Sequence, residues 1–288
     1  MTEPKRIEFA SVPSHAVHGP SKHALKWSGC SHVGRVRKNN EDAFLGSQFD
    51  AREMLRLGKF GEAPMEFMDF VFAVSDGMGG AKAGEFASRI AVEKIATLLP
   101  PSFKQSAVGL EAGYADVLEE LFGEIHSALA YVGSCYEECQ GMETTLSLCW
   151  FTPGWMYFGH IGDSRIYYLP REGGLKQLSH DDTHVGWLFR NGKINEREAR
   201  THPRRNVLQR SLGGNNQFVD PQVGAVGYEA GDIFLLCSDG LTGGLYDENI
   251  VEILRGDTAQ EDIAQLLVEQ SVARDGRDNT TAVVVKVV

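Results

Sequence analysis

The segment Phe70-Val71-Phe72-Ala73-Val74-Ser75-Asp76-Gly77-Met78-Gly79-Gly80 places an unbroken apolar run directly before an acidic residue and a glycine-rich turn. Its β-branched and aromatic residues, followed by glycine, are typical of a buried strand that stops at a turn. Similar runs, each predicting a strand, lie at residues 155–161, 233–237 and 281–288. The acidic residues that flank the four runs are Asp76, Asp163, Asp239 and Asp278.

Apolar residues at helical spacing lie between these strands. We expect helices over residues 83–99, 114–131 and 258–273. The first should stop at Pro100-Pro101, because proline lacks an N–H group and disfavours helical backbone in the residue before it. The last should begin at a Thr258 cap, with Glu261 three residues later. Two consecutive helices between strand-rich halves indicate an α+β fold rather than the strict βαβ alternation of a doubly wound sheet.

The chain has 288 residues, enough for one large domain. Residues 1–24 carry three prolines among charged, serine and histidine residues without periodicity, which predicts a flexible N-terminal tail. No internal repeat or long low-complexity linker divides the remainder. We therefore expect a single domain over residues 25–288.

Composition and charge narrow the class of protein. The formal net charge of −11 argues against general nucleic-acid binding, which depends on neutralisation of phosphates by lysine and arginine. Five scattered cysteines suit reduced thiols in a cytosol. No apolar run approaches the ~20 residues of a membrane span, and the N-terminus lacks the apolar core of a signal peptide. We expect a cytoplasmic protein with no nucleic-acid partner and no membrane span.

Four carboxylates at strand ends predict a shared site. Uncompensated carboxylates crowded at one sheet end would repel one another, so their convergence implies a cation. An oxygen-only ligand set suits Mg²⁺ or Mn²⁺ rather than zinc. Arg37 lies close to Glu41 and Asp42, and an arginine fork beside such a centre could bind phosphate.

Other chemistries fit the sequence poorly. A cysteine phosphatase needs arginine six residues after its cysteine, and none of the five cysteines has one. The glycine-rich residues 77–84 match neither nucleotide-loop pattern, because no Gly-Lys pair precedes serine or threonine and Lys82 takes the place of a required glycine. His160, Asp163 and Ser164 could suggest a catalytic triad, but they crowd one turn and lack a nucleophile elbow.

Residues 27–288 resemble the metal-dependent Ser/Thr protein phosphatase family known as PPM or PP2C, in its bacterial form. The resemblance rests on six short motifs in this order: Arg37-x-x-x-Glu41-Asp42, Ser75-Asp76-Gly77-Met78-Gly79-Gly80, Thr144-Thr145-Leu146, Gly162-Asp163-Ser164-Arg165, Ser238-Asp239-Gly240-Leu241 and Arg277-Asp278-Asn279. It implies a four-layer αββα sandwich, in which helices flank two central antiparallel sheets, with a metal cleft at one end.

The resemblance also implies roles for individual residues. Two Mn²⁺ or Mg²⁺ ions would share a hydroxide that attacks phosphorus directly, so that Asp76 and Asp239 count as catalytic. Arg37 would bind the substrate phosphate. The implied metal-site residues are Glu41, Asp42, Asp76, Gly77, Asp163, Asp239 and Asp278. Glu41 and Asp42 would act through waters on the metals, and Gly77 through its carbonyl.

The activity so implied is hydrolysis of phosphoserine and phosphothreonine in proteins, opposing a Ser/Thr kinase. Two alternatives remain open: a catalytically weak sensor or regulatory module of the same fold, and a phosphatase dedicated to one regulatory phosphoprotein. Phosphopeptide turnover would separate the first from an enzyme. A panel of phosphopeptides against phosphoproteins would identify the second.

Several positions depart from the family pattern. Met78 stands where eukaryotic relatives place a histidine proposed as general acid. Gly243 replaces an aspartate of the family pattern, so a third metal ion should be bound weakly at most. Residues 46–69 predict a surface insertion, either a neutral loop or a partner contact. Residues 179–210 resemble the family's mobile flap beside the cleft. This flap carries a net charge of +3. The charged residues either form ion pairs on a solvated helical face or steer acidic phosphosubstrates toward the cleft.

Overall fold

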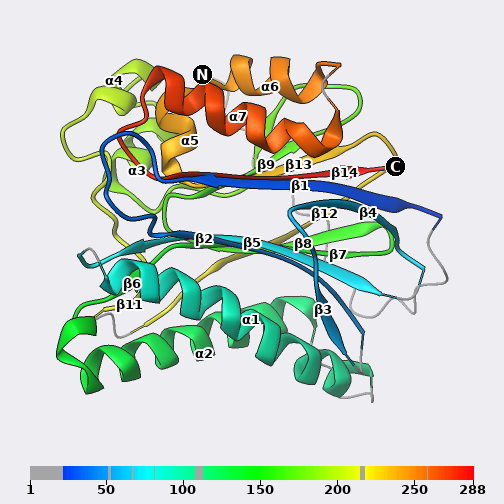
Figure 1. Ribbon diagram of the computed structural model, residues 1–288, viewed down its shortest axis with the longest axis horizontal. Coiled ribbons are helices and arrows are strands. Elements are labelled where there is room, and N and C mark those ends of the chain that lie inside the picture. Colours follow the sequence, from blue (N-terminus) through cyan, green and yellow to red (C-terminus); the bar gives the residue numbers. More distant parts are fainter. Residues whose placement is uncertain are drawn as a thin grey trace.

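The computed structural model describes residues 22–50, 53–66, 68–80, 82–107, 113–214, 218–257 and 259–288. Two antiparallel sheets lie face to face at the centre, and helices cover both outer faces (Figure 1). The α+β fold and the four-layer sandwich expected from the sequence are confirmed. Residues 1–21 of the predicted tail lie outside the described residues, and the first strand begins at Ala24.

The first sheet has six strands in the order β10, β9, β13, β14, β1 and β4. Its two central strands, β13 and β14, are buried along nearly their whole length, which explains their continuous apolar sequence. The strands are β1 (Ala24–His32), β4 (Phe60–Pro64), β9 (Arg165–Leu169), β10 (Lys176–Gln177), β13 (Ile233–Cys237) and β14 (Thr280–Val287).

The second sheet has eight strands and is built around β5, which pairs with β2 on one side and with β7 and β6 on the other. β8 and β12 continue the sheet beyond β7, while β3 pairs with β2 and β11 with β6. The strands are β2 (Asp42–Phe49), β3 (Met54–Arg56), β5 (Asp69–Met78), β6 (Glu143–Thr144), β7 (Leu146–Thr152), β8 (Trp155–Ile161), β11 (Leu212–Gly213) and β12 (Gln222–Gly227).

Helices α1 (Ala83–Ala107) and α2 (Tyr114–Cys135) cover the second sheet, and η1 (Glu137–Cys139) follows them. Helices α5 (Asp239–Gly244), α6 (Asp247–Arg255) and α7 (Gln260–Arg274) cover the first sheet. Figure 1 shows these two helix layers on opposite sides of the sandwich. Two shorter helices, α3 (His184–Arg190) and α4 (Glu196–Thr201), lie toward one end of the molecule.

Aromatic side chains fill the space between the sheets. The Phe151 ring meets the Phe234 ring edge-on at 5.1 Å between centroids, and it meets Phe72 at 5.9 Å. Burying a side chain of this size contributes roughly 1.5–3 kcal/mol. This packing joins the two sheets into one body, so strand ends of both sheets are held at fixed positions relative to each other.

Three predicted helix boundaries were wrong. Helix α2 ends at Cys135, four residues beyond the predicted end at residue 131. Helix α1 continues through Pro100-Pro101 to Ala107. Proline fixes φ at a value that a helix tolerates, so the helix can continue through the pair. Because proline has no N–H group, the Ala96 and Thr97 carbonyls lose their usual hydrogen bonds. Helix α7 begins at Gln260, two residues after the predicted cap. That cap, Thr258, lies outside the described residues.

The segment 46–69, predicted as a surface insertion, is largely β-structure. β3 extends the second sheet by pairing with β2, and β4 extends the first sheet by pairing with β1. The Trp27 ring packs against Gly61, and its Nε1 donates to the Gly58 carbonyl at 3.0 Å. The segment therefore supplies an edge strand to each sheet rather than a free loop.

Candidate active site

Strand ends and turns from both sheets converge on one hollow of about 480 Å³. Asp76 lies near the end of β5, Asp163 follows β8, Asp239 begins α5, and Asp278 precedes β14. The hollow is also lined by Arg37, Glu41, Gly77 and Met78. Of the predicted site residues, only Asp42 is absent from its lining, and Asp42 lies opposite Asp76 in the β2–β5 ladder.

Thr144 and Thr145 hold the backbone of Asp76. Thr144 Oγ1 donates to the Asp76 carbonyl at 2.8 Å, and the Asp76 N–H donates to Thr145 Oγ1 at 3.0 Å. Thr145 Oγ1 also hydrogen-bonds Ser164 Oγ at 2.8 Å. The two buried threonines therefore fix Asp76 relative to the turn that carries Asp163. The sequence offered only their motif, because these partners lie far apart along the chain.

Asp42 connects the two sheets at the base of the site. Its Oδ2 accepts from Ser238 Oγ at 2.7 Å and from Thr281 Oγ1 at 2.6 Å, both belonging to the opposite sheet or its connection. Its Oδ1 is buried and has no hydrogen-bond partner among the described residues. An unpartnered buried carboxylate oxygen is costly, so it suits a bound water or cation.

Asn279 organises the loop before β2, a role that sequence reasoning did not find. Its Nδ2 donates to the carbonyls of Val33 and Asn39 at 2.9 and 3.0 Å, and its Oδ1 accepts from the Glu41 N–H at 2.8 Å. One amide thus satisfies three backbone groups of a loop some 240 residues away. The loop carries Arg37, so Asn279 holds the arginine near the carboxylates.

Arg37 bridges two of the predicted metal-site residues. Its Nη2 donates to Asp278 Oδ2 at 2.8 Å, and its Nη1 lies 4.0 Å from Glu41 Oε2. The side chain is 48% exposed, so it sits at the rim of the hollow rather than inside the core. Without another cation, the guanidinium is the charge that offsets these carboxylates.

The carboxylates disfavour one another's charged form. Burial raises the pKa of Asp76 well above its usual value, and Asp42, Asp239, Asp163 and Asp278 raise it further. Burial and the neighbouring Asp278 raise the pKa of Asp239 to about 7, against smaller opposing effects of arginines. A cluster in which each negative charge destabilises the next is one that a divalent cation would stabilise.

The donor set fits Mg²⁺ or Mn²⁺ in its chemistry. Every predicted ligand offers oxygen, nearby arginines offset only part of the negative charge of the cluster, and Asp42 Oδ1 has no hydrogen-bond partner among the described residues. Within the part of the chain described, no group of three or more His, Cys, Asp or Glu side chains is arranged to hold a metal ion as it stands. The fit therefore rests on ligand chemistry and on the unpartnered oxygen, not on a closed cage.

Gly77 and Gly84 bring the start of α1 against the end of β5. A Cβ at Gly77 would lie 1.9 Å from the Gly84 carbonyl oxygen. A Cβ at Gly84 would lie 2.8 Å from the Gly77 oxygen and 3.0 Å from Glu41 Oε1. Only glycine permits this approach at a residue that lines the hollow.

His160 takes no part in the hollow. Its ring is fully buried, Nε2 donates to the Gly162 carbonyl at 3.1 Å, and Nδ1 accepts from Ser147 Oγ at 2.8 Å. Burial lowers the pKa of His160 to about 4, so the ring is neutral at physiological pH. The arrangement is structural and gives no support to a triad with Asp163 and Ser164.

The segment 179–210 contributes Asn206 to the lining, a residue that sequence reasoning missed. Three of its seven basic side chains are tied to neighbours. Arg190 donates to the Asp181 carbonyl, and Arg210 pairs with Asp220. Arg200 donates to the Thr242 and Leu245 carbonyls at the end of α5. The predicted charge on this segment is therefore partly used in one contact within it, by Arg190, and in contacts with residues outside it, by Arg200 and Arg210.

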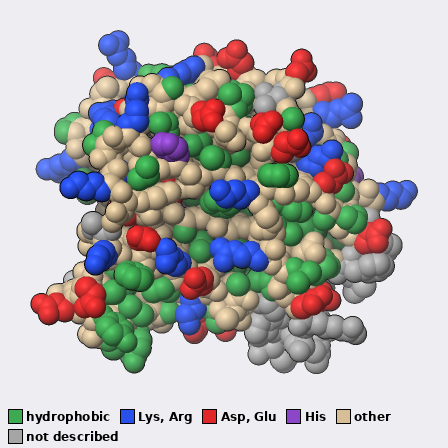
Figure 2. Space-filling view, in the orientation of Figure 1, with side chains coloured by type: hydrophobic (Ala, Val, Ile, Leu, Met, Phe, Trp, Pro, Cys, Tyr) green, Lys and Arg blue, Asp and Glu red, His purple; other side chains and the backbone are tan. Residues whose placement is uncertain are grey.

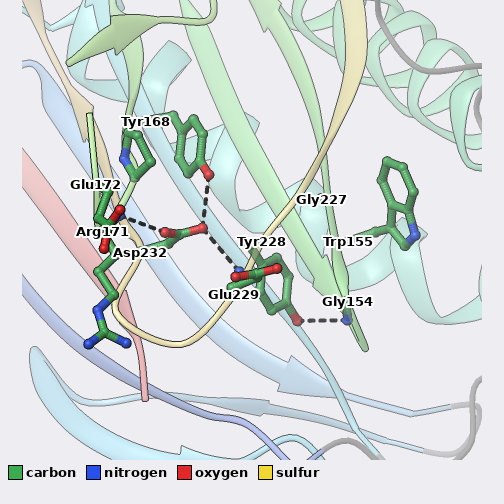
Figure 3. A pocket seen from close by; sticks show the side chains of 10 residues that line it. Gly154, Trp155, Tyr168, Arg171, Glu172, Gly227, Tyr228, Glu229 and Asp232 are labelled. Atoms are coloured by element: carbon green, nitrogen blue, oxygen red, sulfur yellow. Dashed lines mark hydrogen bonds between the residues drawn. The ribbon is translucent and has the colours of Figure 1, made fainter. Parts of the chain in front are cut away.

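A second hollow, of about 790 Å³, lies at the opposite end of β8 and β9. Its lining is drawn in Figure 3. Its central carboxylate, Asp232, accepts from Tyr168 OH at 2.8 Å and from the N–H groups of Arg171 and Glu229. Through these bonds Asp232 connects the turn after β9 to the turn before β13. Glu172 and Glu229 also line this hollow but are exposed, and the oxygens of the buried Asp232 are taken up by these hydrogen bonds, so this hollow is a weaker candidate than the smaller one.

Charged side chains are intermingled on the face shown in Figure 2, where basic groups lie over the seam between the sheets among acidic ones. None of the helices in the described ranges combines the length and apolar character needed to cross a membrane.

Comparison with known proteins places the chain among phosphatases. The family model described as Protein phosphatase 2C matches residues 66–268. The serine/threonine protein phosphatase PstP of Mycobacterium tuberculosis is 35% identical over 268 residues, covering 92% of this chain. The serine/threonine phosphatase stp of Listeria monocytogenes is 30% identical over 254 residues, covering 88% of this chain and 92% of that protein.

A solved structure agrees with these sequence matches. The catalytic domain of PstP in complex with two manganese ions superposes with a TM-score of 0.73 at 32% identity, covering 93% of this chain and 100% of that one. The chain spans 45% of the length of full PstP. Its similarity to PstP is therefore to the catalytic part of a longer protein.

Proposed function

The chain belongs to the protein phosphatase 2C family in its bacterial serine/threonine form, and from this we propose that it hydrolyses phosphoserine and phosphothreonine in proteins. Water is consumed, the phosphorus–oxygen bond to the side chain breaks, and a free hydroxyl and inorganic phosphate are released. The observation that carries the proposal is the convergence of Asp76, Asp239 and Asp278 on one hollow with Arg37 at its rim. We further propose that residues 25–288 form the catalytic domain, that residues 179–210 form its flap, and that a Ser/Thr kinase opposes it.

The cofactor proposed is a pair of Mn²⁺ or Mg²⁺ ions, supported by the two manganese ions of the PstP catalytic domain. When bound, such ions supply positive charge and make hydroxide available from water near neutral pH. The residues proposed to hold the pair are Asp76, the Gly77 carbonyl, Asp239 and Asp278, with Glu41 and Asp42 acting through water. Asp163 is proposed for a third, weaker ion.

Arg37 is proposed to bind the substrate phosphate. Its guanidinium presents several N–H donors in a fixed plane, which matches phosphate oxygens and stabilises their charge as phosphorus is attacked. Asp278 holds one of those donors at 2.8 Å. If the charge of Asp278 were neutralised by a bound cation, Arg37 would be free to turn toward the phosphate. Asp278 would then be ready to hold the cation and Arg37 to bind the phosphate.

The leaving serine or threonine oxygen must gain a proton. Met78 lines the hollow and cannot donate one, because a thioether has no acidic hydrogen. We therefore propose that a solvent water in the cleft provides the proton. This requirement is greatest for a serine alkoxide and small for an aryl oxide, which leaves as a weaker base.

The proposal is tested by phosphate release from phosphoserine and phosphothreonine peptides with Mn²⁺, with Mg²⁺, or with excess chelator. We expect turnover with either metal and background rates with chelator. Asp239→Asn should lower turnover at least about 100-fold with unchanged circular dichroism, because electrostatic stabilisation by such sites is a dominant catalytic effect.

Asp220→Asn provides a matched control, since that carboxylate is 80% exposed on the surface. It should retain normal turnover. Full activity in the chelated protein, or in Asp239→Asn, would rule out the metal-dependent mechanism. Absence of turnover on every phosphopeptide and phosphoprotein, with metal present, would rule out the phosphatase itself.

A further inference from the structure

Asp182 hydrogen-bonds the turn that carries Asp163 through two groups. The Asp182 N–H donates to the Gly162 carbonyl at 2.7 Å, and Asp182 Oδ2 accepts from the Gly162 N–H at 3.0 Å. Both backbone polar groups of Gly162 are therefore held by one residue. The Gly162 carbonyl also accepts from His160 Nε2 at 3.1 Å.

Gly162 leaves this turn little freedom to adjust. Its φ is +109°, a value that side-chain-bearing residues rarely adopt, and a Cβ there would lie 2.5 Å from Thr145 Cγ2. Thr145 in turn binds the Asp76 N–H and Ser164 Oγ. The direction of Asp163 is thus set from one side by Thr145 and from the other by Asp182.

Asp182 also joins the two ends of the segment 179–210. Its carbonyl accepts from the Gln209 N–H at 2.7 Å, close to the end of that segment. Its Oδ1 accepts from Gln222 Nε2 at 3.2 Å, and Gln222 holds the backbone of His180 through two further bonds of 2.6 and 2.8 Å. One residue therefore contacts the Asp163 turn, both ends of the segment, and β12.

We propose that Asp182 is a positioning residue that aims Asp163 into the cleft and couples this turn to the segment 179–210. The proposal rests on the proposed function, because Asp163 matters through its role in the metal site. Asp182 is absent from the lining of the hollow, so it acts through Gly162 and not on the substrate. Its loss should alter metal dependence and turnover while leaving substrate affinity unchanged.

The first test does not depend on activity. Amide hydrogen exchange of Gly162 is measured by nuclear magnetic resonance in metal-free protein labelled with ¹⁵N-glycine. In Asp182→Ala the Gly162 amide loses its acceptor and should exchange at least 10-fold faster. In Asp182→Asn the side-chain oxygen can still accept, so protection should stay within about threefold of the unmodified protein.

The second test measures phosphopeptide turnover against Mn²⁺ concentration. For Asp182→Ala we expect kcat to fall about 10-fold, the Mn²⁺ concentration for half-maximal rate to rise at least fivefold, and KM to change less than twofold. Asp182→Asn should recover most of both losses. Gln222→Met removes the donor to Asp182 Oδ1 and should raise the Mn²⁺ concentration for half-maximal rate by a smaller factor than Asp182→Ala. This variant replaces Asp182→Ala in the test if Asp182→Ala fails to fold.

Asp257→Ala is the control for both tests, because it makes the same change on an exposed aspartate in the loop between α6 and α7. The proposal is overturned if Asp182→Ala matches this control in exchange and metal dependence, or if only its KM changes. If the unmodified protein turns over no phosphopeptide, the proposed function fails, while Gly162 exchange still decides whether Asp182 holds the turn.

Discussion

Asp69 is a buried carboxylate far from the cleft whose titration should affect stability. It is 8% exposed and accepts from Trp150 Nε1 at 2.8 Å. Burial raises the pKa of Asp69 from 3.8 to about 7, partly offset by the Trp150 bond. The folded protein thus holds this proton more tightly than the unfolded chain. The resulting stability is complete below pH 4 and is lost as pH rises through about 7.

Asp69→Asn should remove this dependence, since the amide keeps an oxygen for Trp150 and carries no charge. At pH 8 we expect the variant to be more stable than the unmodified protein by about 2–4 kcal/mol, and at pH 4 the two should be nearly equal. Urea unfolding at both pH values measures this. Equal differences at pH 4 and pH 8 would contradict the prediction.

Arg37→Ala should weaken phosphate engagement rather than metal binding. A hydrogen bond to a charged group contributes about 2–3 kcal/mol, so kcat/KM at saturating Mn²⁺ should fall about 30- to 150-fold. Removing the guanidinium from Asp278 should leave Mn²⁺ affinity in calorimetry unchanged or tighter. A collapse of metal affinity with normal turnover at saturating metal would show that the role is wrongly assigned.

Met78→His should affect substrates according to the basicity of the leaving group. An imidazole at this position could donate a proton to a serine alkoxide, which needs it, whereas nitrophenolate does not. The pH profile for phosphopeptide should therefore shift more than the profile for nitrophenyl phosphate. Identical shifts for both substrates would exclude proton donation from position 78.

Single residues of the site were predictable where one residue type carries the chemistry. Asp76, Asp239 and Arg37 stand in recognisable sequence patterns, and the structure brings them to one hollow. Thr145, Asn279 and Asp182 act through hydrogen bonds to backbone groups far away in sequence. No local pattern specifies such partners, so only the folded chain reveals them.

The close contact between the elements α1 and β5 can be tested for its effect on stability and turnover. Gly84→Ala places a methyl group 2.8 Å from the Gly77 oxygen, so the helix start or the strand end must shift. We expect a loss of about 1–3 kcal/mol in stability and at least 10-fold in turnover. Gly123→Ala in α2 is the control, because its Cβ meets nothing within 4 Å.

Gly123→Ala should raise stability by up to about 1 kcal/mol, the difference in helix propensity, with normal turnover. Chemical unfolding and phosphopeptide assays on both variants measure these effects. Normal turnover in Gly84→Ala would mean that the close approach of α1 is not needed at the site.

Elements were predictable where burial is continuous. β13 and β14 are apolar along their length, and α2 places Leu118, Leu121, Phe122, Ile125 and Leu129 on one buried face. The edge strands β3 and β4 were missed because three to five half-exposed residues give no periodic signal. The end of α1 was misjudged because the backbone angle of proline is compatible with a helix.

For the whole molecule, metal binding should be a large contribution to stability, since it relieves repulsion among buried carboxylates of both sheets. At 100 times the dissociation constant, a ligand contributes about 2.7 kcal/mol. Mn²⁺ at that level should raise the unfolding midpoint by about 5–10 °C. In Asp239→Asn the rise should be less than half as large, as measured by calorimetry. Equal rises in both proteins would place the stabilising ion elsewhere.

β1 lies between β4 and β14, so the first strand of the domain is paired along its length with the last. Leu25 faces Val287 and His32 faces Thr280, a separation of about 250 residues. On the ribosome, β1 emerges early and must wait for nearly the whole chain before this partner is available. A nascent chain halted before residue 280 would expose the apolar edges of β1 and β13 and lack the strand that follows Asp278. Such a chain would be a chaperone client, and the site would assemble only as synthesis of the domain is completed.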